Sequence, residues 1–292
     1  MAELSQPKPF DEAFAWARDR VALPTTLGHD QLQALRRQIG RKGLLLARVA
    51  DARILSAVQD RIGQLARGVQ ERPGEYMDPG KFRVEMQSIL NSVDYKPEPG
   101  REGTISDLRS KARLDLIVQT ETELAAGRAQ QAADLDPDVT DMFPAWELYR
   151  AKKGKTSRDW EERWRIAANA SGDATALAAL DDHSRMVARK DSPIWAELGS
   201  SDNFDDALDT DHAPFAFNSG MALRNINRAT AVNLGIIQRG QRLAPTQSQQ
   251  PEPLEQSVAS ISPQIRAALL GVMPGATINE AGTLSVDGGG AA

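Results

Sequence analysis

Apolar residues recur at helical spacing through much of the first ninety residues. The series Ile54, Val58, Ile62 and Leu65 follows the 3.6-residue period of an α-helix. Further series fall at residues 10–17, at 32–39 with a second stretch after Gly43 through 49, and at 82–90. A proline at position 24 ends the first series, because a proline ring is incompatible with a helix interior. The pattern predicts a helical N-terminal domain over residues 1–96.

Prolines and glycines at residues 97–103 separate this domain from the next helical pattern. Apolar residues from Ile105 to Leu124 predict a helix that begins at Thr104 as N-cap and ends near Gly127. Farther along the chain, the spacing of two tryptophans, at 160 and 164, places them on one helix face. A Ser-Pro pair at 192–193 is typical of the start of a short helix. The pattern becomes irregular after residue 199, and we take residues 97–237 as the second domain.

The last part of the chain has a different composition. Residues 238–264 are rich in Gln, Ser, Pro and Arg and read as a linker, followed by a short helix near Ile265–Leu270. Residues 277–286 predict a hairpin that turns at 280–282. The fold class expected is therefore mainly α with a small α+β portion, and residues 238–292 form an extended tail.

Composition narrows the possible functions. The chain has 292 residues, with 35 Lys+Arg against 40 Asp+Glu, a formal net charge of −5, no cysteine and 3 histidines. Disulfides, thiolate metal sites and cysteine nucleophiles are excluded, and the scattered histidines do not supply a convergent site. We expect no metal ion and no cofactor. The chain has no apolar run long enough for a membrane span and no signal-peptide pattern at its start, so we expect cytosolic synthesis and no membrane partner.

Several motifs resemble binding or catalytic sites, but each lacks either the required spacing or the accompanying residues. Gly154-Lys155-Thr156 resembles the end of a phosphate-binding loop, but Tyr149 stands where the first glycine is needed. The aspartates of residues 202–211 lack EF-hand spacing, and we expect a solvated acidic loop there. His212 follows an aspartate, but no nucleophile motif accompanies the pair. We therefore expect that the protein is not an enzyme.

Basic residues are concentrated at 31–72 and 148–165. The second stretch is interleaved with Tyr149, Trp160 and Trp164, a combination that suits contact with a nucleic-acid backbone or an acidic protein surface. The alternative is that these charges form the solvated face of amphipathic helices. The candidate contact residues are Arg150, Lys152, Lys153, Lys155, Arg158, Arg163 and Arg165.

Six blocks of sequence occur in order over residues 9–237. They are Pro9–Trp16 with Arg20–Thr25, Ala47–Val49 with Ile54–Gly68, Arg113–Thr120 with Ala126–Arg128 and Gln131, Trp146–Arg150, Asp182-His183 with Lys190–Trp195, and Asp211–Met221. Together they resemble the phage head morphogenesis family, the Mu F-like minor head proteins that associate with the portal. The resemblance implies a strand-like element at Trp146–Arg150. It also implies structural roles for Arg113, Thr120, Arg128, Trp146, His183, Trp195, Pro214, Phe217 and Asn218.

Residues 211–221, which we call the Pro-aromatic-Asn segment, differ from the family in one respect. Many relatives continue after the asparagine with Cys-x-Cys, whereas Ser219 follows Asn218 here. We therefore expect packing of Phe215, Phe217 and Met221 to hold the segment, with Asn218 as a turn or capping residue.

The resemblance implies a structural minor head (minor capsid) protein of a tailed bacteriophage, inside the head at the portal vertex and made in the host cytoplasm. The implied partner is the portal protein, with the major capsid or scaffold protein and packaged double-stranded DNA as further partners. Several copies per virion and roles in head assembly, DNA retention or DNA ejection are also implied. The alternative is a cytosolic nucleic-acid-binding regulatory protein, against which the net charge of −5 counts.

Overall fold

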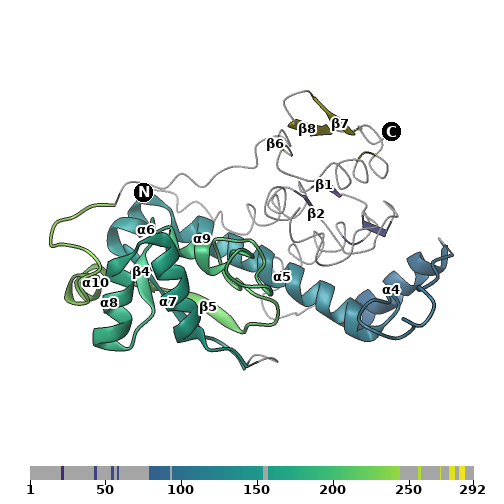
Figure 1. Cartoon of the computed structure of the whole chain (residues 1–292), viewed down its shortest axis with the longest axis horizontal. Coiled ribbons are helices and arrows are strands. Elements are labelled where there is room, and N and C mark those ends of the chain that lie inside the picture. Colours follow the sequence, from purple (N-terminus) through teal and green to yellow (C-terminus); the bar gives the residue numbers. More distant parts are fainter. Residues whose placement is uncertain are drawn as a thin grey trace, which may run out of the picture. The chain divides into compact units, whose positions relative to one another are not determined.

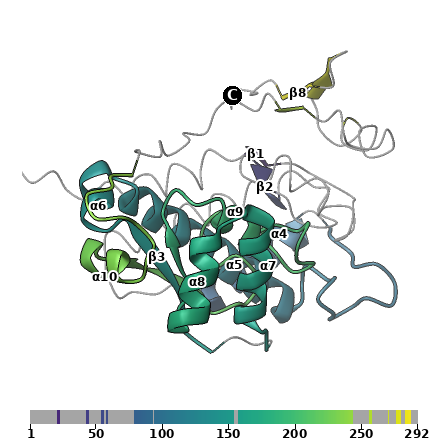
Figure 2. The same cartoon turned by 60° about the vertical axis from the view of Figure 1, so that its left-hand side comes forward.

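The structure is a computed structural model, shown in Figures 1 and 2. It describes residues 21–22, 43–44, 54–55, 58, 79–92, 94–153, 157–243, 256–257, 270, 276–279 and 283–286. About 48% of the described part is helical, and it contains a three-stranded antiparallel sheet. This confirms the expectation of a mainly α chain with a small β portion.

The described residues fall into two compact units. One lies within residues 123–243, and the other within residues 21–122 and 256–286. The division falls inside a helix, so the loop at 97–103, where the sequence placed the first domain boundary, lies within one unit. The boundaries 1–96, 97–237 and 238–292 remain predictions, because compactness by itself does not define an independently folding domain.

The unit within residues 21–122 and 256–286 contains α4 (Pro79–Ser92), as its apolar period predicts, and the first half of α5 (Lys111–Asp134). Its core joins buried side chains from three segments, and Arg83 of α4 donates a hydrogen bond to Asp115 of α5 over 2.6 Å. The buried core residues are Ile54, Leu55, Val58, Phe82, Met86, Leu90, Leu108, Leu114, Ile117 and Val118.

The same unit is not purely helical where the sequence predicted helices. Strand β1 (Val21–Ala22) pairs in parallel with β2 (Gly43–Leu44), which lies at the break between the two apolar stretches that were predicted to be helical at residues 32–49. Glycine is a weak helix former, and strand pairing with a distant segment is not visible in a local period. The other residues of the predicted 10–17 and 32–49 helices lie outside the described residues.

Helix α5 starts later and ends later than predicted. Residues 101–110 form successive turns, and the hydroxyl of Ser110 accepts from the backbone N–H of Arg113 over 3.1 Å, so Ser110 rather than Thr104 is the N-cap. Gly127 does not end the helix. A Cβ at Gly127 would lie 1.9 Å from the carbonyl oxygen of Ala213, so the glycine permits close packing of α5 on a loop.

The unit within residues 123–243 is built on one sheet with strand order β4-β3-β5. Its strands are β3 (Ala145–Arg150), β4 (Val187–Arg189) and β5 (Met221–Ile226). Helices α7 and α8 lie side by side (Figure 2). The helices that follow α5 are α6 (Pro137–Met142), α7 (Trp160–Ser171), α8 (Ala174–His183), α9 (Ile194–Leu198) and α10 (Arg228–Asn233).

Alternation along β3 supplies two hydrophobic clusters. Trp146 and Leu148 pack with α7 and α9, whereas Ala145 belongs to a second cluster with Ile226 and residues of α8 and α10. Trp160 and Trp164 are both buried on one face of α7, as their spacing predicted. These contacts place the β3–α7 connection and the Pro-aromatic-Asn segment beside each other.

At the C-terminal end, β7 (Ala276–Ile278) pairs antiparallel with β8 (Thr283–Val286), which confirms the predicted hairpin. Strand β6 (Gln256–Ser257) pairs with the other edge of β8. Most of the predicted linker and short helix lies outside the described residues. Among the helices that the structure describes, none is both long and apolar enough to span a membrane.

Candidate functional site

The basic stretch that links β3 to α7 is divided by the structure into exposed and inward-facing charges. Arg158 and Arg163 face inward, with side chains only 9% and 11% exposed. Lys155 lies outside the described residues. The basic residues of this stretch that reach solvent are Arg150, Lys152, Lys153 and Arg165. The predicted contact surface is therefore smaller than the sequence indicated.

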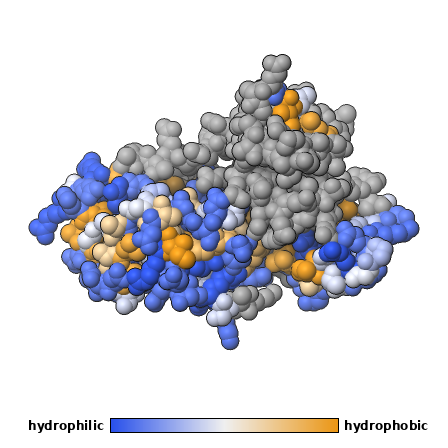
Figure 3. Space-filling model, viewed as in Figure 1, coloured by the Kyte–Doolittle hydropathy of each residue, from blue (hydrophilic) through white to orange (hydrophobic). Residues whose placement is uncertain are grey.

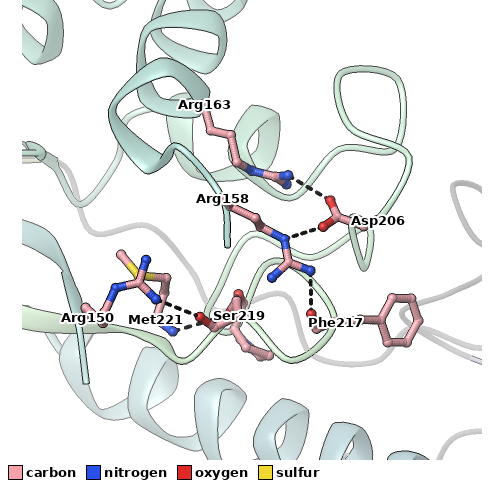
Figure 4. A network of polar contacts seen from close by, with 8 residues as sticks. Arg150, Arg158, Arg163, Asp206, Phe217, Ser219 and Met221 are labelled. Atoms are coloured by element: carbon pink, nitrogen blue, oxygen red, sulfur yellow. Dashed lines mark hydrogen bonds and ion pairs between the residues drawn. The ribbon is translucent and has the colours of Figure 1, made fainter. Parts of the chain in front are cut away.

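Arg158 and Arg163 share one carboxylate, that of Asp206 (Figure 4). Arg163 Nη1 lies 2.7 Å from Asp206 Oδ1, and Arg158 Nε donates to Asp206 Oδ2. Burial alone would raise the pKa of Asp206, but hydrogen bonds and charge from the two arginines outweigh it and hold that pKa below its ordinary value. The 202–211 stretch is thus not purely a solvated acidic loop, because Asp206 is an internal ion-pair partner.

The aromatic neighbours of Arg163 explain why a guanidinium group is tolerated there. Its Cζ lies 3.9 Å from the ring centroid of Phe204 and 5.0 Å from that of Trp160. Burial lowers the pKa of Arg163, and the Asp206 carboxylate opposes that shift. A planar guanidinium group suits this position between aromatic rings.

The Pro-aromatic-Asn segment is held by hydrogen bonds from arginine side chains to its backbone carbonyls, as well as by packing (Figure 4). Arg158 Nη2 donates to the carbonyl of Phe217 over 2.6 Å, and Arg150 Nη1 lies 3.5 Å from the carbonyl of Ser219. Asn218 has a φ of 52°, which confirms it as a turn residue. Of the three residues expected to hold the segment by packing, Phe215 and Met221 are buried and Phe217 is half-buried.

Ser219, which follows the turn residue Asn218, is fully buried. Its Oγ donates to the carbonyl of Pro214 over 2.7 Å and accepts from the backbone N–H of Met221 over 3.2 Å. One hydroxyl therefore joins both ends of the turn, and the expectation that packing alone holds this segment is corrected.

Three blocks of the family resemblance meet at Trp195. Its ring lies 5.7 Å from Trp146 and 5.5 Å from Trp164 in edge arrangements, and 6.2 Å from Phe215 in a stacked arrangement. Aromatic pairs with this spacing stabilise a core beyond the area that they bury. Trp146 and Trp195, which the resemblance singled out, are thus neighbours, and the buried Pro214 precedes the stacked phenylalanine.

The other residues singled out by the resemblance lie on helices or beside them. His183 is exposed at the end of α8, whereas His212 is buried with Nδ1 2.8 Å from the carbonyl oxygen of Ala213. Arg128 donates to Gln131 over 2.6 Å, and Gln131 in turn lies 3.3 Å from the carbonyl of Asp211. On the same helix, Thr120 is buried and Arg113 is half-buried.

Sequence reasoning missed the polar centre of this unit. Asp134, at the end of α5, accepts from Trp146 Nε1 over 3.0 Å and from Asn225 over 2.7 Å, and its backbone carbonyl accepts from Lys190 over 2.5 Å. Burial lowers the pKa of Lys190 to about 8, against the attraction of Asp134. No local sequence pattern marks this centre, because these partners come from separate elements.

The arrangement is a set of internal hydrogen bonds and ion pairs. Across the ranges that the structure describes, no group of three or more His, Cys, Asp or Glu side chains is placed to hold a metal ion. Comparisons of the chain with family models, curated proteins and solved structures find no match.

Proposed function

We propose that this chain is a structural minor head protein of a tailed bacteriophage, which binds the portal and acts in head assembly, DNA retention or DNA ejection. The observation that carries the proposal is the meeting of three family-like blocks at Trp195, through Trp146 and Phe215. Residues 49 and 20 positions apart in the sequence thus share one aromatic core. The resemblance thereby rests on residues that determine packing.

A structural role also agrees with what the inward-facing residues do. Arg158, Arg163 and Asp206 fix the loop before the Pro-aromatic-Asn segment, and Ser219 fixes the turn inside it. A surface held in this way loses little conformational entropy when a partner binds, which favours a stable assembly.

The surface itself favours polar contacts with the partner. On the face shown in Figure 3, hydrophilic residues predominate, with separate hydrophobic areas between them. The exposed large apolar residues of the described part are Val84, Ile105, Met142, Ile166 and Leu270. They are scattered over several elements, so charge complementarity with the portal is the basis of recognition that we propose.

Co-expression with the portal protein of the same phage tests this function. Size-exclusion chromatography and mass photometry at low and moderate salt measure whether the two proteins form a complex and with what copy ratio. We expect a stable complex with fewer copies of this chain than of portal subunits. A monomer that ignores the portal at both salt concentrations but shifts duplex DNA would favour the nucleic-acid-binding regulatory protein instead.

A further inference from the structure

One part of the small sheet carries two arginines around a single carboxylate and an aromatic ring. Glu147 and Tyr149 lie two residues apart on β3, so their side chains share a face of the sheet. Arg224 of β5 is directly opposite Glu147, and Arg185 lies just before β4, on the other side of β3. We call Glu147, Tyr149, Arg185 and Arg224 the two-arginine surface.

Glu147 fixes the positions of both guanidinium groups. Arg185 donates to both carboxylate oxygens, over 2.8 Å from Nε and 2.6 Å from Nη2, and Arg224 Nε donates to Oε2 over 2.6 Å. Burial would raise the pKa of Glu147, but the hydrogen bonds from Arg185 and Arg224 lower it. The carboxylate therefore stays ionised, and the cluster keeps one net positive charge.

Arg224 remains accessible although its Nε is bound. Its side chain is 56% exposed, and its guanidinium lies over the ring of Tyr149 with Cζ 5.3 Å from the ring centroid. Within the part of the chain that the structure describes, its two terminal nitrogens donate to no acceptor, and neither does Nη1 of Arg185. The exposed Lys152 and Lys153 follow the end of β3.

We propose that the two-arginine surface binds the phosphodiester backbone of a nucleic acid. Arg185 and Arg224 donate to the same oxygen of Glu147, so their guanidinium groups converge, and their unused donors suit a tetrahedral phosphate with several acceptor oxygens. The buried carboxylate and the tyrosine ring hold both groups in place before binding, which reduces the entropic cost. This inference rests on the DNA contact within the proposed function and not on portal binding. It places that contact on the sheet rather than on the inward-facing Arg158 and Arg163.

Fluorescence anisotropy of a short labelled duplex with the full chain, over a series of salt concentrations, tests the inference. We expect Arg224→Ala to weaken binding about tenfold and to reduce the slope of log affinity against log salt by about 1, as for the loss of one phosphate contact. Arg101→Ala is the matched control, because it removes an exposed arginine that is paired with Glu98 and is not one of the candidate contact residues of the 148–165 stretch. The control should keep affinity within about twofold of the wild type, as is usual for an exposed pair outside a binding site.

A second variant separates the charge of Arg224 from the geometry of its guanidinium group, and a competitor separates a nucleic acid from an acidic protein partner. Arg224→Lys keeps the charge and loses the guanidinium fork, so we expect binding roughly threefold weaker with an unchanged salt slope, even if the alanine variant fails to fold. Equal effects of the Arg224 and Arg101 variants would overturn the inference. The inference would also be overturned if polyglutamate displaced the labelled duplex as effectively, charge for charge, as unlabelled duplex does. That result would indicate an acidic protein partner. Portal binding is measured separately, so loss of the DNA result leaves the proposed function standing.

Discussion

Asp206 is the residue whose replacement tests the internal ion-pair network most directly. Asp206→Asn keeps the shape of the side chain but removes the negative charge that Arg158 and Arg163 share. Removing one partner of a fully buried pair costs about 3–5 kcal/mol. Because the Asp206 side chain is 35% exposed, solvent screening reduces our expectation to about 2–3 kcal/mol. For a chain of this size that corresponds to a decrease in Tm of roughly 4–12 °C.

Thermal unfolding followed by tryptophan fluorescence measures this change, since Trp160 lies beside Arg163. The matched control is Asp181→Asn, which breaks the exposed pair with Arg165 and should change stability by no more than about 0.5 kcal/mol. A Tm for Asp206→Asn equal to that of Asp181→Asn would refute the reasoning.

The pH dependence of stability gives a second check. The folded-state pKa of Asp206 is below its ordinary value of 3.8, so its contribution is present above that pH and is lost as pH falls through the folded-state pKa. The asparagine variant should lack this acid-dependent loss.

Further variants test the packing and the buried polar groups. Gly127→Ala should destabilise although alanine is about 1 kcal/mol more favourable than glycine in a helix, because its Cβ would lie 1.9 Å from the Ala213 carbonyl oxygen. Ala126→Gly, at an exposed position of the same helix, is the control for propensity alone, and a Tm of Gly127→Ala at or above that of the wild type would contradict the close approach. Lys190 has a pKa lowered to about 8, below its unfolded-state value of about 10.4, so wild-type stability should rise as pH increases between these values. Urea titrations should show that rise and its absence in Lys190→Met; the same rise in both proteins would exclude Lys190 as its source. Ser219→Ala should cost about 0.5–1.5 kcal/mol by removing the hydroxyl that bonds both the Pro214 carbonyl, which keeps the Ala216 N–H as a donor, and the Met221 N–H; an unchanged urea midpoint would show that packing alone holds the turn.

The local pattern of the sequence predicted several elements correctly. The apolar period of residues 82–90 predicted α4, the spacing of Trp160 and Trp164 predicted one buried helix face, and the turn residues at 280–282 predicted the C-terminal hairpin. Each of these elements depends on residues a few positions apart, and such short-range preferences can be predicted from a single sequence.

The errors share a physical cause. Thr104 and Gly127 have the right residue types for a helix start and a helix end, but Ser110 caps α5 and Gly127 makes room for the Ala213 carbonyl. A residue type can satisfy several local roles, and the partner that selects among them comes from a distant part of the chain.

The sequence by itself determined the helical character, the absence of cysteine chemistry and the clustering of basic residues. Only the tertiary structure decided which of those basic residues face solvent. Arg158 and Arg163 are turned inward, where both pair with Asp206 and two aromatic rings lie beside Arg163, whereas the side chain of Arg224 over Tyr149 is more than half exposed. Burial of a charge depends on whether a compensating group is nearby in space, and the sequence order does not contain that distance.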